Sequence, residues 1–240
     1  MQRIKHIFRS IFKYRTASTF TVLSLVTAFL CIIIISLYVS FERSYDDFHT
    51  NGESIYRIET VETAMIPAVL ADVVREKVPE IVNVSATCYR GQRKISIDNT
   101  GVDNEFIIAS PLYVEGEFLS MFTFPLIKGN AATSLVEAGN IVLSESLSKK
   151  IFGNENAYGK TLFLNKRQLT VSGVMKDFPT NSTFKSDCLV SFETLTKDNG
   201  GEKSFTKAWS EWSFYIFIQT FEGANPDVII DKISEIEVLS

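Results

Sequence analysis

The feature that most constrains this chain is an uncharged stretch of 26 residues, from Thr16 to Phe41. As an α-helix rising about 1.5 Å per residue, the stretch would be roughly 39 Å long, whereas the hydrocarbon core of a bilayer is about 30 Å thick. A secretory signal peptide has an apolar region of only about 7–15 residues and a cleavage site of small residues. Here bulky Tyr38, Val39 and Phe41 stand where cleavage would be expected. We therefore predict a retained transmembrane helix rather than a signal peptide or a buried core helix, and the rest of the chain contains no second run of this kind.

The charges on either side of the run predict its orientation. Residues 1–15 carry five basic side chains and no acidic one; the basic residues are Arg3, Lys5, Arg9, Lys13 and Arg15. Basic residues at the end of a span stay on the cytoplasmic side, so the N-terminus is predicted inside and everything after Phe41 outside. Beyond residue 15, 19 of the 24 basic residues remain against all 28 acidic ones, a balance of −9. Such a balance argues against a nucleic-acid-binding surface on the exported part.

Residues 2–15 have a helical pattern of their own. Apolar side chains recur three and four residues apart, at Ile4, Ile7, Phe8, Ile11 and Phe12. A basic amphipathic helix of this kind lies on an anionic membrane surface with its apolar side down. We predict such a helix over 1–15, with the five basic residues as its membrane-surface contacts. The alternative is a plain flank of the span.

The exported part is predicted to be a mixed α and β domain, of class α+β. Alternating or short apolar runs predict strands at 54–61, 81–90, 93–97, 104–110, 124–130, 140–143, 160–164, 168–175 and 212–220. Helical spacing and caps predict helices at 66–80, 116–122, 145–152 and 225–239. Ser144 and Asn225 are expected as N-caps and Gly153 as a helix stop. Turns are expected at Gly91-Gln92 and, within a hairpin, at 165–167. The alternating aromatic residues Trp209, Trp212, Phe214 and Tyr215 are expected in the core, with a binding cleft as the alternative.

Cysteine and histidine are too sparse for a structural zinc site. The three cysteines, Cys31, Cys88 and Cys188, stand far apart, and the only histidines are His6 and His49. No CxxC pair or Cys/His cluster is present, so we expect no metal site of this type. An exported compartment permits a disulfide between Cys88 and Cys188, but two unpaired, partly buried thiols are the favoured interpretation.

One short motif resembles catalytic chemistry. Ser146 and Lys149 have the S-x-x-K spacing that places a lysine amine one helical turn from a serine nucleophile. The partner motifs of such enzymes are incomplete here and occur in the wrong order, since Lys160-Thr161 precedes Ser186-Asp187. Lys149 and its neighbour Lys150 are better interpreted as cations at a helix C-terminus. We therefore predict no catalytic residue in this chain and no enzyme activity.

Four stretches of the chain resemble, in order, the sequence elements of one family. They are FERSYDDFHTNGESIYRI (41–58), EGEFLSMFTFPLIKGN (115–130), IVLSESLSKKIFGNENAYGKTL (141–162) and LTVSGVMKDFPTNSTFKSDCLVSF (169–192). They resemble elements of the permease subunits in the MacB/FtsX family of bacterial ABC transporters, the mechanotransmission class. Together they are spread over residues 41–192 of the chain.

This resemblance implies the N-terminal part of a permease. The domains would be a cytoplasmic basic helix (1–15), a transmembrane helix (16–41) and a MacB-like periplasmic core domain (42–240) of one or two subdomains. Family members have four transmembrane helices, three of them after the periplasmic domain, and this chain ends with one. The core domain is therefore expected to be incomplete at its C-terminal end. A truncated chain, a split gene and a degenerate copy all remain open.

The resemblance also implies function and partners. The periplasmic domain would transmit conformational change driven by ATP, which a separate cytoplasmic ATPase subunit would bind, and this chain would hold no cofactor. Partners would be the lipid bilayer, that ATPase, a second permease copy and a periplasmic adaptor or substrate protein. The location would be the bacterial inner membrane. The residues expected at the joint between span and domain are Glu42, Tyr45, Asp46, Phe48, Tyr56 and Arg57.

Two other functions remain as alternatives. The first is a single-pass, membrane-anchored periplasmic module that binds a partner without transport activity of its own. The second is an anchored exported hydrolase, for which Ser146 is the candidate nucleophile. A plain structural connector is the alternative for the joint.

Overall fold

The computed structural model describes residues 15–98, 106–201 and 204–236. It divides into two compact units, Met1–Asp47 and Phe48–Ser240. Everything from Phe48 onward belongs to the second of these units. Four of the five predicted membrane-surface residues, Arg3, Lys5, Arg9 and Lys13, lie outside the described residues, and Arg15 is the first residue of helix α2.

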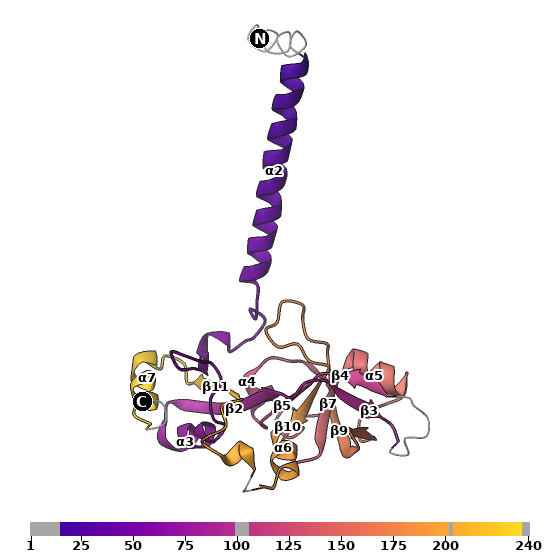
Figure 1. The fold of residues 1–240 in the computed structure, drawn as a ribbon, viewed down its shortest axis with the longest axis vertical. Helices are drawn as coiled ribbons and strands as arrows, with labels where there is room; N and C mark the ends of the chain where they lie inside the picture. The colour runs from indigo at the N-terminus through magenta and orange to yellow at the C-terminus, as the bar shows by residue number, and fades with distance from the viewer. Residues whose placement is uncertain (1–14, 99–105, 202–203, 237–240) are drawn as a thin grey trace. The chain divides into compact units, whose positions relative to one another are not determined.

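Among its described residues, the first unit contains helix α2, Arg15–Arg43 (Figure 1). Of the described helices, only this one is long and apolar enough to cross a membrane, over Thr16–Arg43, with a mean hydropathy of 2.7. The hydroxyl groups of Thr21, Ser24 and Thr27 bond back to carbonyls of the helix, each at 2.9 Å. Such bonds satisfy polar side chains where no water is available. The helix therefore suits the apolar environment that the sequence predicted for it.

The second unit is built on one mixed sheet of eleven strands. Their order is β1-β11-β2-β5-β10-β7-β9-β8-β3-β4, with β6 paired to β9. Adjacent strands run parallel in two cases, β5 with β10 and β7 with β9. The other adjacent strands are antiparallel. The bounds are β1 Ile55–Ile58, β2 Ile81–Tyr89, β3 Arg93–Ser96, β4 Ile107–Ala109, β5 Pro111–Val114, β6 Leu126–Lys128, β7 Asn140–Ser144, β8 Thr161–Leu164, β9 Arg167–Met175, β10 Cys188–Ser191 and β11 Tyr215–Thr220. This mixed architecture confirms the predicted fold class.

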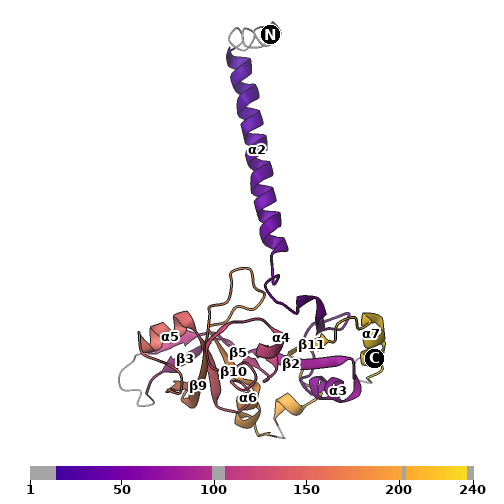
Figure 2. The same ribbon diagram turned by 180° about the vertical axis from the view of Figure 1, so that it is seen from behind.

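Helices cover both faces of the sheet, and each face has its own core. Helices α3 (Val69–Lys77) and α6 (Phe192–Asp198) lie on one side of the strands and α4 (Phe118–Met121) on the other (Figures 1 and 2). Helices α5 (Glu145–Phe152) and α7 (Pro226–Ser234) also contribute to the core on the side of α3. Neighbouring residues of one strand point to opposite faces, so Tyr113 of β5 joins the α3 side and Leu112 the α4 side.

Three predicted helix caps are confirmed. The Ser144 hydroxyl accepts the Leu147 amide at 3.2 Å, and the Asn225 side chain accepts the Asp227 amide at 3.0 Å. Gly153 ends α5 with φ at 63°, the left-handed region that favours glycine. Local polar chemistry thus sets these boundaries, as the sequence indicated.

The sheet differs from the sequence-based expectation in two ways, one in strand pairing and one in which segments form strands. Strands β2 and β3 flank Gly91-Gln92 but do not pair, because β3 lies between β4 and β8. The central strands β5 and β10 were not predicted as strands of their own. All four residues of each are buried, so neither shows the alternation of a half-buried strand.

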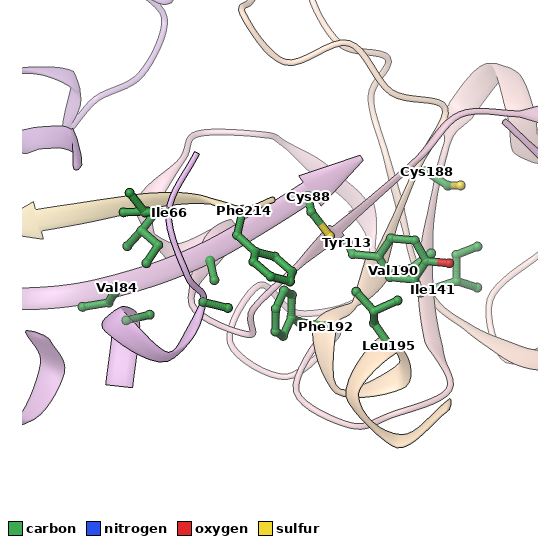
Figure 3. Close-up of a cluster of buried hydrophobic side chains, with 14 of the residues drawn as sticks. Ile66, Val84, Cys88, Tyr113, Ile141, Cys188, Val190, Phe192, Leu195 and Phe214 are labelled. Atoms are coloured by element: carbon green, nitrogen blue, oxygen red, sulfur yellow. The ribbon is translucent and has the colours of Figure 1, made fainter. Parts of the chain in front are cut away.

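Cys88 and Cys188 are free thiols, which agrees with the expectation of two unpaired cysteines. Both are fully buried, whereas partial burial was expected. They lie on β2 and β10, and strand β5 separates the two (Figure 3). Tyr113 of β5 stands between them in the core. Strands two places apart in a sheet are about 9.5 Å apart, whereas the Cα atoms of a disulfide lie within about 7 Å. The sheet therefore excludes the bridge.

The aromatic residues before and within β11 separate into two groups. Phe214 is fully buried and packs edge-on against Phe192, with ring centroids 5.6 Å apart. Trp209 and Trp212 are 38% and 40% exposed, so the prediction of a core position was wrong for them. They precede β11, where no strand periodicity applies.

Candidate functional site

The predicted joint residues divide between the two units. Glu42 ends the span within α2, and Tyr45 packs edge-on against Phe41 with ring centroids 5.7 Å apart. Asp46 has a φ of 58°, so the chain turns sharply at this residue. Phe48 opens the second unit and is half-buried. The helix of the span therefore ends five residues before the folded domain begins.

A hydrogen-bonded anchor fixes the first residues of the domain. The imidazole of His49 is buried, and its Nδ1 accepts the amide of Thr123 at 3.0 Å. The amide of Thr50 in turn donates to the Thr123 hydroxyl at 3.0 Å, and the two threonine hydroxyls are also 3.0 Å apart. Residues 48–50 are thus joined to residue 123, which follows α4. We call residues 48–50 with 122–124 the joint.

The joint packs into a cluster of phenylalanine rings on the α4 side of the sheet. Phe124 is at its centre, with ring centroids 5.9 Å from Phe48, 5.1 Å from His49 and 4.6 Å from Phe178. We call the whole set the aromatic cluster; its members are Phe48, His49, Phe118, Phe122, Phe124, Phe178, Phe184 and Phe217. Edge-to-face and offset pairs of this kind are each worth about 0.5–1.5 kcal/mol beyond their buried area. The joint is therefore held by packing as well as by hydrogen bonds.

The aromatic cluster also holds a long connection between two central strands. Residues 176–187 join β9 to β10 and stand out from the sheet as an extended loop (Figures 1 and 2). The loop begins with the Lys176 amide bonded to the Pro125 carbonyl at 3.0 Å. Two of its residues, Phe178 and Phe184, enter the aromatic cluster, and Ser182 between them is fully buried. A displacement of the joint would therefore act on this loop and, through it, on strands β9 and β10.

Tyr56 and Arg57, the remaining predicted joint residues, lie on the edge strand β1. Tyr56 is 40% exposed, and Arg57 pairs with Glu59 at 2.7 Å on the surface. Exposed ion pairs contribute little to stability, typically about 0–1 kcal/mol. The structure thus brings Phe48 into the joint and leaves Tyr56 and Arg57 at the sheet edge.

Sequence reasoning missed the residues that complete the joint. His49, Phe122, Thr123 and Phe124 all lie in stretches that carried the family resemblance. Residues 49 and 123 are 74 positions apart, so no local periodicity connects them. The signals that could have found them were the FH pair (48–49), a few residues after the span, and the FTFP run (122–125) at the end of a short predicted helix.

A second polar feature is formed by Arg75 of α3, whose guanidinium contacts three carboxylates. Its guanidinium reaches Asp72 at 3.2 Å, Glu115 at 3.1 Å and Glu117 at 2.9 Å. Glu115 also accepts the Ala86 amide at 3.0 Å, and its side chain is 20% exposed. Burial raises the pKa of Glu115 to about 7, although Arg75 favours its charged form. These groups border a cavity of about 520 Å³ and tie α3 to β2 and to the segment before α4.

The S-x-x-K residues do not form a nucleophilic pair. Lys149 is bonded to Glu145 at 2.5 Å rather than to Ser146. The Ser146 hydroxyl donates to Asp177, whose other oxygen accepts the Ser146 amide at 2.9 Å. A carboxylate that accepts the amide of the first turn stabilises a helix N-terminus. Within the described residues, no group of three or more His, Cys, Asp or Glu side chains is placed to hold a metal ion.

Comparison with known proteins agrees with this architecture. The family model described as the MacB-like periplasmic core domain matches residues 18–236. The macrolide export ATP-binding/permease protein MacB of Aggregatibacter actinomycetemcomitans is 39% identical over 90 residues, which are 34% of this chain and 14% of that protein. The match therefore spans only about one seventh of that relative's length.

Solved structures share the fold. A domain of a protein from Porphyromonas gingivalis, described as a permease, superposes with a TM-score of 0.66 at 22% identity, over 79% of this chain and 85% of that one. The periplasmic region of MacB from Actinobacillus actinomycetemcomitans gives 0.53 at 20% identity, over 76% and 80%. The extracellular domain of the ABC-type transporter YknZ from Gram-positive bacteria gives 0.50 at 13% identity, over 78% and 94%. Since the family model covers most of the chain, the protein belongs to the MacB-like periplasmic core domain family of ABC transporter permeases.

Proposed function

We propose that this chain is the part of an ABC permease subunit that carries movement of a membrane span into a periplasmic domain. The observation that supports this most directly is the joint. The chain leaves α2 at Arg43, and by His49 it is already bonded to Thr123 and packed against Phe124. A short connection to a rigid anchor transmits displacement, whereas a long flexible linker would absorb it.

The route of this movement follows from the contacts of the aromatic cluster. A shift of residues 48–50 acts on α4 through residues 122–124, and on the 176–187 loop through Phe178. That loop leads directly into β10, at the centre of the sheet. The exported domain would therefore respond as a packed unit rather than by local bending.

The partners follow from the family. ATP would be bound by a separate cytoplasmic ATPase subunit, and a second permease copy would complete a dimer in the bacterial inner membrane, with the N-terminus cytoplasmic and residues after about 41 periplasmic. A periplasmic adaptor or substrate protein would contact the exported domain. The relative from Aggregatibacter is named for macrolide export; for this chain the cargo class stays open between small molecules, peptides and lipoproteins.

Hydrogen–deuterium exchange on the native permease with its ATPase tests this proposal. We expect amide protection at 48–50, 122–124 and 178–184 to change between the nucleotide-free state and a state trapped with ATP and vanadate. Strands β8 and β3, which the 176–187 loop does not connect, serve as the internal reference. Protection that is identical in the two states would contradict transmission through the joint. A native protein that purifies with no ATPase would instead support the single-pass binding module.

A further inference from the structure

The hydrogen bond at His49 defines the protonation state of its ring. Nδ1 accepts the Thr123 amide, and an amide N–H can only donate, so Nδ1 carries no proton. A neutral imidazole has one N–H, which must then be at Nε2. A second proton could be added only at Nδ1, where it would face the Thr123 N–H. The closed joint therefore holds a neutral histidine, whatever its Nε2 contacts.

The surroundings of the ring make this restriction effective. The side chain is buried at 8% exposure, and its ring lies against Phe48, Phe122 and Phe124, with centroids 4.2, 5.1 and 5.1 Å away. Thr50 and Thr123, whose hydrogen bonds define this anchor, are uncharged. The acidic residues nearest along the chain are Asp46, Asp47 and Glu53. A ring enclosed in this way must move in order to take up a second proton from water.

We propose that His49 is a proton-sensitive switch of the joint. A proton taken from solvent at Nδ1 removes the acceptor of the Thr123 amide and releases residues 48–50 from residues 122–124. This inference rests on the proposed function only for its consequence, the uncoupling of the span from the domain. The switch itself is a property of the hydrogen bond and of the aromatic cluster.

The sign and size of the effect follow from linkage. In the closed joint, where the Thr123 amide donates to His49, Nδ1 cannot take up a proton. In the open joint, where this bond is broken, His49 is an ordinary imidazole with a pKa of about 6.5. Opening is then favoured by acid. Between pH 7.5 and 5.5 the open fraction should rise about tenfold, because the protonated form adds to the open state alone.

The test uses the full chain in lipid nanodiscs with isotope-labelled histidine. The chain has only two histidines, His6 and His49, so a His6→Gln background leaves one imidazole signal. At pH 7.5 the ring nitrogens should show the neutral Nε2–H tautomer. Exchange of the Thr123 amide, corrected for the intrinsic rate, should accelerate about tenfold at pH 5.5.

His49→Asn is the matched control. The Asn Oδ1 occupies the place of Nδ1 and can accept the same amide, but it does not titrate. In this variant the corrected exchange at Thr123 should be equal at pH 5.5 and 7.5. A proton on Nδ1 at pH 7.5, or equal exchange at both pH values in the parent, would overturn the proposal. Neither readout depends on transport, so a failed switch and a failed transmission model remain distinguishable.

Discussion

Truncation of Phe124 should destabilise the exported domain more than that of any exposed ring. Phe124 is 6% exposed, and its ring lies within 6.4 Å of six others, those of Phe48, His49, Phe118, Phe122, Phe178 and Phe184. Phe124→Ala removes this buried area and leaves a cavity between α4, the joint and the 176–187 loop. Substitutions of this kind cost about 3–5 kcal/mol in the free energy of unfolding, a large share of the roughly 5–15 kcal/mol of a typical domain.

Urea unfolding of the full chain in detergent measures this cost. Trp209 and Trp212 both lie in the exported domain and are the only tryptophans, so their fluorescence reports on its unfolding. Phe221→Ala is the matched control, because Phe221 is 48% exposed and belongs to neither core. We expect it to cost about 1 kcal/mol or less. A loss below about 1 kcal/mol for Phe124→Ala would refute the view that this ring holds the joint.

Three further predictions concern the rest of the domain. Because folding raises the pKa of Glu115 from 4.5 to about 7, the folded state binds its proton more tightly, so this contribution to stability is present at low pH and is lost as pH rises from about 4.5 to 7. The unfolding free energy of the parent relative to Glu115→Gln should therefore fall by on the order of 2–3 kcal/mol between pH 5 and pH 8, and a difference that rises with pH would contradict this. Burial raises the pKa of Cys88 to about 11 and that of Cys188 further, so neither should react with a water-soluble thiol reagent at pH 8 until urea unfolds the domain; fast labelling of the native chain at either residue would disprove their burial. Ser146→Ala should leave any hydrolytic activity of the preparation unchanged while lowering stability by about 1 kcal/mol through the lost bond to Asp177, and loss of hydrolysis would reinstate a nucleophile.

Local sequence signals predicted the ends of elements well and their partners poorly. Ser144 begins α5 and Gly153 ends it through contacts with residues nearby in the chain. The local sequence therefore specifies both ends of this helix. The pairing of β3 with β4 and β8 instead of β2 depends on where distant strands lie. Strands β5 and β10 are buried throughout, and a short apolar run without alternation predicts neither a strand nor its neighbours.

The sequence indicates the region of the candidate site but not the residues that complete it. Phe48 is expected near the joint because it follows the span, and in the structure its ring packs against Phe124. His49 and Thr123 were not named, since their hydrogen bond joins residues 74 positions apart. Tyr56 and Arg57 belonged to the same conspicuous stretch of sequence, but the sheet places them at its edge.

The sequence by itself indicated the apolar span and the mixed α and β class of the domain that follows it. Hydropathy, basic flanks and helix caps act over distances of a few residues, so they can be recognised without a fold. Only the tertiary structure decided which rings surround Phe124, why Cys88 and Cys188 cannot pair, and that His49 accepts an amide from beyond α4. These features arise from side chains that are far apart along the chain and meet when the sheet assembles, because burial of apolar surface does not depend on sequence distance.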